Sequence, residues 1–354
     1  MAEILLITTD HKLLWWKLSE QDLHRTGILD INTIIGYLND NNHNTEVLNF
    51  AQLDWKRDYS GVYVFYAGDE TPGNVYRKRI DDAIYFLHNA GAILIPDYML
   101  FKAYGNKCYM EMLRQTFKND AFKTINSKIY GSFKEFIDCK DEFSYPCVIK
   151  PAIGSGSMGV ALVKSKNELY KAAYNVSQSN YLQLTPLNIL RLAKRKVERI
   201  IRKHDDYSNC NNRNGFVVQN FIPNMPGDYK VLIYWDKYYT LYRKNRDNDF
   251  RASGSGLLSL VPEDQNTDIL EFARSFRTEI DTPFMSLDIG YDGKIFHLIE
   301  FQCMAFGPYT LQASDYYYTF ENQVWKIHRS KSSLELEIAR TIDQFIRFRQ
   351  KNEK

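Results

Sequence analysis

The segment YPCVIKPAIGSGSMGVALV, residues 145–163, decides the predicted fold. Its first half, PCVIK, is typical of a buried strand that ends at Lys150, and three glycines follow within six residues, at 154, 156 and 159. The residues after the glycines, VALVKS, again favour a strand, whereas a P-loop leads into a helix whose N-terminus binds phosphate. The segment therefore predicts a strand, a glycine-rich loop and a second strand, and it excludes a P-loop.

These residues alone leave two interpretations of the loop open. It can be a tight hairpin turn. It can also bind phosphate, because glycines let backbone N–H groups approach closely and the hydroxyls of Ser155 and Ser157 add donors. A lysine that ends a buried strand favours the second interpretation, since buried lysines are rare without a partner. The alternative for Lys150 is a side chain that extends to solvent.

Composition limits the classes of partner. A chain of 354 residues with 44% apolar content exceeds one compact domain. Its 45 basic and 43 acidic residues nearly cancel, so neither a nucleic-acid nor a membrane partner is expected. Five scattered cysteines without zinc-like spacing indicate reduced thiols. An acidic residue near the N-terminus and the lack of a long apolar run lead us to expect a cytoplasmic protein.

Hydrophobic periodicity predicts how the chain is organised. Over the first hundred residues strands and a helix alternate, which indicates a small open α/β sheet: strands 3–8, 47–50, 61–66 and 92–95, and helix 75–89. No GxGxxG follows the first strand, so no nicotinamide cofactor is expected there. The rest of the chain is predicted to hold helices 106–117, 167–177, 185–204 and 334–349, and strands 123–125, 147–150, 160–163, 215–220, 230–234, 238–243, 285–289 and 295–301.

Polar residues at the ends of the later strands suit a nucleotide. The strand that begins near residue 216 runs into QNFI, residues 219–222, whose backbone could be read by an adenine. Asp228 then offers a carboxylate for ribose hydroxyls. Lys230, Arg243 and Arg251 place cations at strand ends, as phosphoryl transfer requires. Each of them alone would more often be a surface charge.

A metal site is predicted on the next pair of strands. Glu300 and Gln302 are two residues apart and so share one face of a strand, while Asp288 comes from the antiparallel neighbour. Oxygen ligands of this kind suit Mg²⁺ that bridges nucleotide phosphates. The alternative is a pair of edge-strand carboxylates bonded to nearby arginines.

In this order, the motifs resemble the ATP-grasp superfamily, and most closely its glutathione-synthetase and ribosomal-protein glutamate-ligase branch. The resemblance covers about residues 98–305 and rests on VIKP with GSGSMG, on QNFIPNMPGDYKV, on RASGSG and on the aspartate that precedes EFQ. It implies an α+β class, with an ATP-grasp fold of two α+β subdomains that clasp ATP, after a small open α/β domain. The implied domains are 1–105, 106–218 with the glycine-rich loop, and 219–354 with the metal site.

The resemblance also implies a role for each matching residue. The nucleotide and its phosphates are contacted by Lys107, Lys150 and the loop residues Gly154, Ser155, Gly156, Ser157 and Gly159. The adenine hinge is Gln219, Asn220, Phe221 and Ile222, and the ribose-binding acid is Asp228. The catalytic cations are Lys230, Arg243 and Arg251, and the ligands of Mg²⁺ or Mn²⁺ are Asp288, Glu300 and Gln302. The sequence departs from the family at Gln302 and Ser253, where the family usually has asparagine.

The activity implied is that of an ADP-forming carbon–nitrogen ligase. ATP phosphorylates a carboxylate, and an amine or a thiol displaces phosphate from the acyl phosphate, so no protein nucleophile is needed. An ATP-grasp kinase and a non-catalytic nucleotide-binding module are the alternatives. The expected partners are small-molecule or peptide carboxylates and amines. The basic segment 187–203 could bind an acidic substrate or be a solvated helix face, and segments 67–74 and 303–310 are further candidates for substrate contact.

Overall fold

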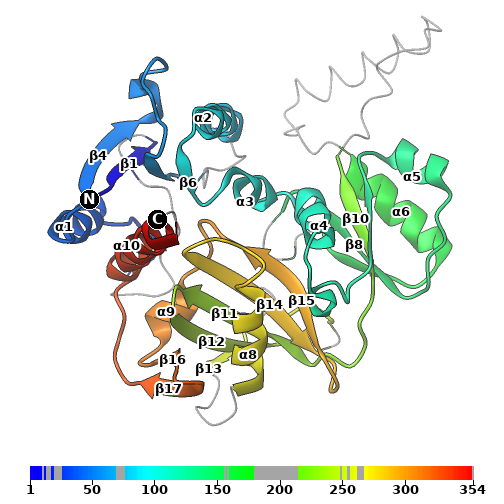
Figure 1. The fold of residues 1–354 in the computed structure, drawn as a ribbon. Helices are drawn as coiled ribbons and strands as arrows, with labels where there is room; N and C mark the ends of the chain where they lie inside the picture. Colours follow the sequence, from blue (N-terminus) through cyan, green and yellow to red (C-terminus); the bar gives the residue numbers. More distant parts are fainter. Residues whose placement is uncertain are drawn as a thin grey trace, which may run out of the picture. The chain divides into compact units, whose positions relative to one another are not determined.

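The computed structural model describes residues 1–9, 12, 17–19, 26–68, 76–154, 157, 159–178, 214–247, 249–252, 256–260 and 267–352 (Figure 1). The chain divides into two compact units. The larger unit comprises Met1–Tyr104, Leu113–Thr124 and Asn224–Lys354, and the smaller unit comprises Gly105–Met112 and Ile125–Pro223. The predicted helix 185–204 lies outside the described residues. The predicted domain boundaries remain a prediction.

The first part of the larger unit is the predicted open α/β sheet. Its four strands are all parallel, in the order β4 (Asn44–Asn49), β1 (Glu3–Thr8), β5 (Tyr63–Tyr66) and β6 (Ile93–Ile95). The side chains of residues 4–7 are fully buried, as expected for a central parallel strand covered on both faces. The helices of this part are α1 (Ile31–Asp40), α2 (Arg77–Asn89) and α3 (Tyr98–Ala103), and its short elements are β2 (Lys17–Leu18), β3 (Thr26–Gly27) and η1 (Phe50–Gln52).

The second part of the larger unit is an antiparallel sheet. The strand order is β15-β14-β11-β12-β16-β17, and β13 also pairs with β12. The strands are β11 (Gly227–Tyr234), β12 (Lys237–Lys244), β13 (Leu258–Leu260), β14 (Phe284–Tyr291), β15 (Phe296–Gln302), β16 (Tyr317–Glu321) and β17 (Val324–His328). The helices are α8 (Thr267–Phe276), α9 (Tyr309–Ala313) and α10 (Leu334–Asn352).

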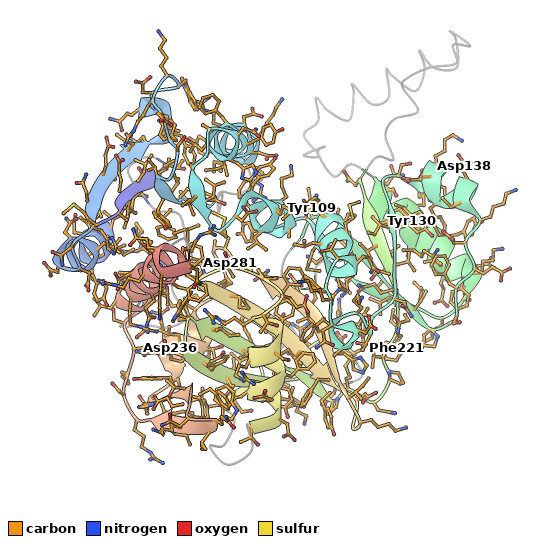
Figure 2. The ribbon with its side chains drawn as sticks, in the orientation of Figure 1. Tyr109, Tyr130, Asp138, Phe221, Asp236 and Asp281 are labelled. Atoms are coloured by element: carbon orange, nitrogen blue, oxygen red, sulfur yellow. The ribbon has the colours of Figure 1, made fainter. Side chains whose placement is uncertain are left out.

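The two sheets of the larger unit share one hydrophobic core. The core cluster contains residues of β1 and β5 together with residues of β11, β14 and α10. Phe65 and Phe284, for example, form an edge-to-face pair whose ring centroids are 6.2 Å apart. Ion pairs join α10 to Asp236 and Asp281, which flank β11 and β14 and are labelled in Figure 2: Arg340 contacts Asp236 at 2.7 Å and Arg349 contacts Asp281 at 2.9 Å. Residues more than 200 positions apart therefore fold together.

The smaller unit is a four-stranded sheet with helices α5 (Phe133–Cys139) and α6 (Lys166–Ser177). The strand order is β7 (Ser127–Tyr130), β10 (Phe216–Asn220), β8 (Cys147–Pro151) and β9 (Ala161–Val163), all antiparallel. Its core is aromatic: Tyr130 (Figure 2) and Phe216 lie with ring centroids 5.3 Å apart, and Phe136 packs against both. Helix α4 (Lys107–Gln115) begins in the smaller unit and ends in the larger one.

One predicted strand is wrong. Residues 123–125 are not a strand, because the chain forms the short 3₁₀ helix η2 (Asp120–Phe122) and the strand begins only at Ser127. The side chain of Asn119 accepts a hydrogen bond from the backbone N–H of Ala121 at 3.0 Å, which stabilises a turn that ends at Lys123. Helix α1 and the hairpin of β16 and β17 were not anticipated.

No helix among the described residues is long and apolar enough to cross a membrane.

Gly227, the first residue of β11, has no room for a side chain. A Cβ atom there would lie 2.3 Å from the backbone oxygen of Arg243 and 2.6 Å from the hydroxyl of Tyr242. We expect Gly227→Ala to lower the free energy of unfolding by about 1–3 kcal/mol or more, because the backbone of β12 must shift. Urea denaturation measures this change.

The matched control is Gly36→Ala on the exposed face of α1, where no heavy atom lies within 4 Å of the added Cβ. This variant should gain about 0.5–1 kcal/mol, because alanine favours a helix over glycine. Equal unfolding midpoints for the two variants would show that the close approach at Gly227 is misjudged.

Candidate functional site

Six of the predicted residues lie on one face of the antiparallel sheet of the larger unit. Lys230 on β11 is directly opposite Asp288 on β14, which is in turn directly opposite Glu300 on β15. Side chains directly opposite in antiparallel strands share a face, as do residues two apart on one strand. The same face therefore also holds Gln302, and Asp228 with Arg243 opposite it.

The charges on this face form a compact cluster. The Arg243 guanidinium binds both carboxylate oxygens of Asp228, with Nε–Oδ1 at 2.6 Å and Nη2–Oδ2 at 2.8 Å. Arg243 Nη2 also lies 2.8 Å from Oδ2 of Asp288, and Lys230 Nζ lies 3.3 Å from Oδ1 of Asp288. Two cations and two carboxylates thus compensate one another in a region where Arg243 and Asp228 are 7% and 6% exposed.

The cluster moves the pKa values of its two carboxyl groups in opposite directions. Burial raises the pKa of Asp228 to about 6; the guanidinium of Arg243 opposes this rise, and the charge of Asp288 adds to it. Burial also disfavours ionisation of Asp288, but Arg243 and Lys230 together lower its pKa to about 2. At neutral pH both groups are therefore ionised. Burial lowers the pKa of Arg243, but Asp288 and Asp228 raise it by more. The pKa of Arg243 therefore lies above its ordinary value.

The predicted metal ligands have donor chemistry that fits Mg²⁺. Glu300 Oε1 accepts a hydrogen bond from Nε2 of Gln302 at 3.0 Å, so these two side chains are adjacent. Mg²⁺ is usually held by one or two carboxylates together with substrate phosphates and waters, rather than by a complete protein cage. The described residues contain no cluster of three or more His, Cys, Asp or Glu side chains that could hold a metal ion. Two carboxylates and an amide oxygen therefore fit a metal that arrives with a nucleotide.

The alternative interpretation of Asp288 also has support. Asp288 is bonded to a lysine and an arginine, as a structural carboxylate would be. Asp228 likewise uses both oxygens for Arg243, so its assignment to ribose hydroxyls remains a prediction. The third predicted cation, Arg251, forms a two-point pair with Asp249, with Nε–Oδ1 at 2.9 Å and Nη2–Oδ2 at 2.7 Å. Ser253, two residues later, lies outside the described residues.

In the smaller unit the glycine-rich loop joins β8 to β9, which pair directly as the sequence predicts. Gly159 has φ +75°, and a Cβ there would lie 3.0 Å from Pro151 Cγ, so this position favours glycine. Lys107 at the start of α4 donates from Nζ to the backbone oxygen of Gly154 at 2.6 Å. Ser157 adopts φ +60°, and Ser155 and Gly156 lie outside the described residues. A predicted phosphate ligand thus already contacts the loop backbone.

Lys150 and Gln219 share one face of the smaller sheet. Lys150 is opposite Val217, which is two residues before Gln219 on β10. The other face, with Ile149 and Phe216, packs into the aromatic core. The half-buried Lys150 therefore projects away from that core, on the side where strand β10 presents its polar end.

The predicted adenine hinge lies where β10 ends. The side chain of Gln219 is 3% exposed and donates to the hydroxyl of Ser127 at 2.9 Å, so it is part of the interior. Asn220 Oδ1 accepts from the backbone N–H of Asn126 at 2.6 Å. Phe221 (Figure 2) and Ile222 follow the last strand residue and are half-buried. Of the four predicted hinge residues, these two lie beyond the sheet ladder.

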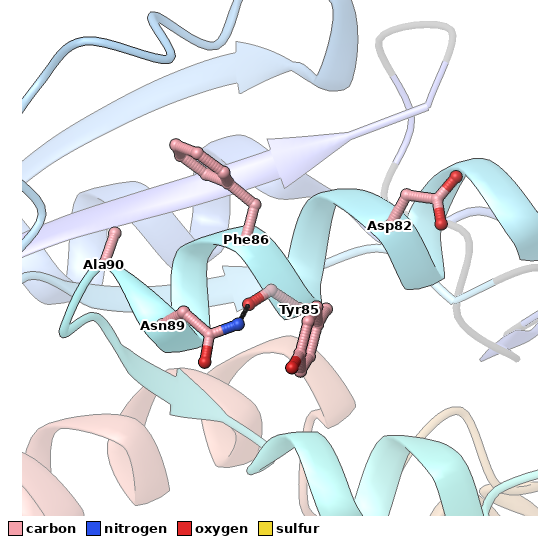
Figure 3. A pocket seen from close by; sticks show the side chains of 5 residues that line it. All are labelled: Asp82, Tyr85, Phe86, Asn89 and Ala90. Carbon is pink, nitrogen blue, oxygen red and sulfur yellow. Dashed lines mark hydrogen bonds between the residues drawn. The ribbon is translucent and has the colours of Figure 1, made fainter.

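The other predicted substrate contacts are described only in part. Segment 187–203 and most of segment 67–74 lie outside the described residues. Residues 303–306, which follow β15, are buried, and Ala305 adopts the left-handed φ of +44°. A hollow of about 450 Å³ on α2 is lined by Asp82, Tyr85, Phe86, Asn89 and Ala90, all from α2 or the residue after it (Figure 3). It contains none of the predicted site residues.

Comparison with protein families supports the predicted class. Residues 111–186 match the family model for the carbamoyl-phosphate synthase L chain, ATP binding domain. The matched segment contains β8, β9 and the glycine-rich loop between them. The matched segment thus resembles the ATP-binding domain of an ATP-grasp protein. The predicted resemblance, the α+β class and the superfamily's cofactors ATP and Mg²⁺ are thus confirmed at the level of the superfamily. Individual site residues remain predictions.

Two solved structures of low sequence identity align over nearly the whole chain. D-cycloserine synthetase is 12% identical with a TM-score of 0.48, and the alignment covers 97% of this chain and 99% of that one. D-alanine–D-alanine ligase from Bacillus anthracis is also 12% identical, with a TM-score of 0.48 and coverage of 99% and 100%. At this level of similarity no activity and no residue role is transferred from them. Comparison with curated proteins finds no match.

Sequence reasoning missed two arginine contacts. The partner of Arg251, Asp249, is two residues away, and the short acid–base spacing in NDFR was the available signal. The second is Arg114 on α4, which is fully buried. The sequence feature that could have indicated its burial is its spacing. Arg114 lies four residues after Met110 and three before Phe117, and so on the apolar face of the predicted helix.

The raised pKa of Asp228 predicts a pH effect on stability. Its folded pKa of about 6 lies above the ordinary value near 4, so the folded state binds more protons between these values. The contribution of Asp228 to the free energy of unfolding should therefore fall by about 1–2 kcal/mol as the pH rises from 4 to 6. Urea denaturation of the wild type and Asp228→Asn across this window isolates the effect. Parallel pH profiles for the two proteins would contradict it.

Proposed function

We propose that the chain is an ATP-dependent ligase that joins a carboxylate to an amine, or to a thiol, through an acyl phosphate. The observation that carries the proposal is the row of Lys230, Asp288 and Glu300 across β11, β14 and β15. These three residues come from three different strands, and they share one face of the sheet with Arg243 and Gln302. Clustered cations beside oxygen ligands for Mg²⁺ suit phosphoryl transfer.

The proposed reaction has two steps. A carboxylate oxygen of the substrate attacks the γ-phosphorus of ATP, the bond to the bridging oxygen breaks, and ADP leaves. The amine nitrogen then attacks the acyl carbon, the bond between this carbon and the phosphate oxygen breaks, and inorganic phosphate leaves while the nitrogen loses a proton. Each step separates or spreads negative charge, which fixed cations stabilise. No protein nucleophile is required.

The larger unit supplies the proposed charge-stabilising groups. Asp288, Glu300 and Gln302 would hold Mg²⁺ or Mn²⁺, which screens the phosphate oxygens when bound. Lys230 and Arg243 are oriented by Asp228 and Asp288, so their positive charges are already in place. Arg251 is oriented by Asp249 and is one-third exposed, which leaves it accessible to a substrate. Preorganised cations of this kind lower the energy of developing oxyanions.

The smaller unit supplies the proposed nucleotide contacts. We assign Lys107, Lys150 and the backbone of the glycine-rich loop, with its hydroxyl groups at 155 and 157, to the phosphates. Residues 219–222 are assigned to the adenine, chiefly through the backbone of Phe221 and Ile222, which lie beyond the strand. The substrates are proposed to be small-molecule or peptide carboxylates and amines.

Arg251→Ala should lower kcat by about 10²-fold or more, by analogy with the removal of one oxyanion donor. Initial rates of phosphate release at saturating ATP measure this effect. The matched control is Arg274→Ala on α8, which removes an arginine paired with Glu271 in the same two-point way. A folded Arg251→Ala protein that retains the wild-type rate would exclude the proposed role.

Asp288→Asn combined with Glu300→Gln should abolish Mg²⁺-dependent ATP turnover, because both carboxylates of the proposed metal site become neutral. Steady-state ADP formation over a range of Mg²⁺ concentrations measures the effect. Circular dichroism and thermal unfolding check that the variant is folded. Turnover that survives in a folded variant would show that the metal ligands are misassigned.

A screen of carboxylate and amine pools with purified protein tests the reaction class. A ligase releases phosphate from ATP only when both a carboxylate and a nucleophile are present. A kinase instead yields a stable phosphorylated product with one substrate, and mass spectrometry distinguishes the two outcomes. A protein that binds nucleotide and turns over in no pool would support the non-catalytic alternative.

A further inference from the structure

The metal strand β15 contains a β-bulge next to the proposed site. Residues 300–302 pair with residues 288–286, whereas residues 296–298 pair with residues 291–289, so Ile299 is an extra residue. Without it, Glu300 would lie opposite Leu287 instead of Asp288. Because a shift of one residue transfers side chains to the other face of a sheet, the bulge decides which face presents Glu300 and Gln302.

Burial on the opposite face confirms this effect of the bulge. Leu287 and Ile289 are two apart on β14 and both are fully buried. Their partners on β15, Phe301 and Leu298, are three apart and yet both are buried, at 2% and 0% exposure. A regular strand would place residues three apart on opposite faces. The extra residue is thus accommodated on the face of Glu300.

Arg114 binds the backbone at this bulge. Its guanidinium donates from Nη1 to the oxygen of Leu298 at 2.6 Å and from Nη2 to the oxygen of Ile299 at 3.1 Å. Nη1 also donates to the oxygen of Phe122 at 3.1 Å, which ties the bulge to η2. Arg114 is 0% exposed, and an arginine is almost never so buried unless it is paired. β15 lies at the edge of its sheet, and this arginine donates to two consecutive carbonyls where the bulge interrupts the register.

We propose that Arg114 is a positioning residue for the metal site: it stabilises the bulge that places Glu300 and Gln302 opposite Asp288. The inference rests on the proposed function, which assigns these three residues to Mg²⁺. Arg114 touches neither the metal nor a substrate, and acts through the backbone of β15. Groups that orient metal ligands typically change metal affinity by about 10–100-fold when they are replaced.

The test compares Mn²⁺ affinity in variants that differ in donors. Arg114→Met keeps a similar length but loses all donors, and Arg114→Lys keeps the charge with donors at a single point. Mn²⁺ binding is measured by electron paramagnetic resonance with a non-hydrolysable ATP analogue present. We expect the Kd for Mn²⁺ to rise about 10–100-fold in Arg114→Met and by less in Arg114→Lys. The concentration of Mg²⁺ for half-maximal ATP turnover should rise in the same order, while KM for ATP at saturating Mg²⁺ changes little.

The matched control is Arg277→Met, which removes a half-buried arginine of the larger unit, one that packs over the ring of Trp235 at 4.3 Å. It should lose stability but keep the wild-type Kd for Mn²⁺. A purely structural role for Arg114 predicts the same pattern for Arg114→Met, and that result overturns the inference. If Arg114→Met does not fold, an unchanged Kd in folded Arg114→Lys overturns it equally.

The reference variant Asp288→Asn separates this inference from the proposed function. If the wild type binds Mn²⁺ with the nucleotide analogue and Asp288→Asn does not, the metal site stands and the Arg114 variants decide the inference. If Asp288→Asn binds Mn²⁺ as the wild type does, the proposed metal site fails, and the inference fails with it.

Discussion

The register between β14 and β15 is the constraint on which the candidate site depends. One extra residue, Ile299, places Glu300 and Gln302 on the face of Asp288, and the same register extends through Asp288 to Lys230 on β11. Side chains alternate in a strand, so a slip of one residue would move the carboxylate and the amide to the buried face. Backbone geometry, more than the identity of any side chain, therefore assembles this part of the site.

Charge compensation is the second requirement of this face. Asp228, Arg243, Asp288 and Lys230 are mostly withdrawn from water, and burial of an unpaired charge is costly. Removal of one partner from a buried ion pair typically lowers the free energy of unfolding by about 3–5 kcal/mol, so each of these charged groups depends on its partners. The same contacts hold the cations in fixed positions. Stability and the proposed chemistry thus depend on one set of ion pairs, and substitutions in it need a folding control.

The elements with strong local patterns could be predicted from the sequence, and the order of the motifs indicated the superfamily. Strand β1, the two strands around the glycine-rich loop and helix α10 follow from periodicity and from glycine positions. The strand predicted at 123–125 failed because a turn capped by the side chain of Asn119 extends to Lys123. Helix α1 went unrecognised although Asp30 caps its N-terminus and apolar residues recur at helical spacing at 31, 34, 35 and 38.

The spacing of Glu300 and Gln302, and the place of the glycines between two strands, are properties of the local sequence, because strand alternation and backbone freedom act over a few residues. Tertiary structure alone decided that both oxygens of Asp228 bind Arg243 and that Arg114 binds a bulge 184 residues away. It also decided that the N-terminal sheet and α10 share one core. Such pairings depend on strand register and packing between distant segments, and no local pattern of residue types encodes them.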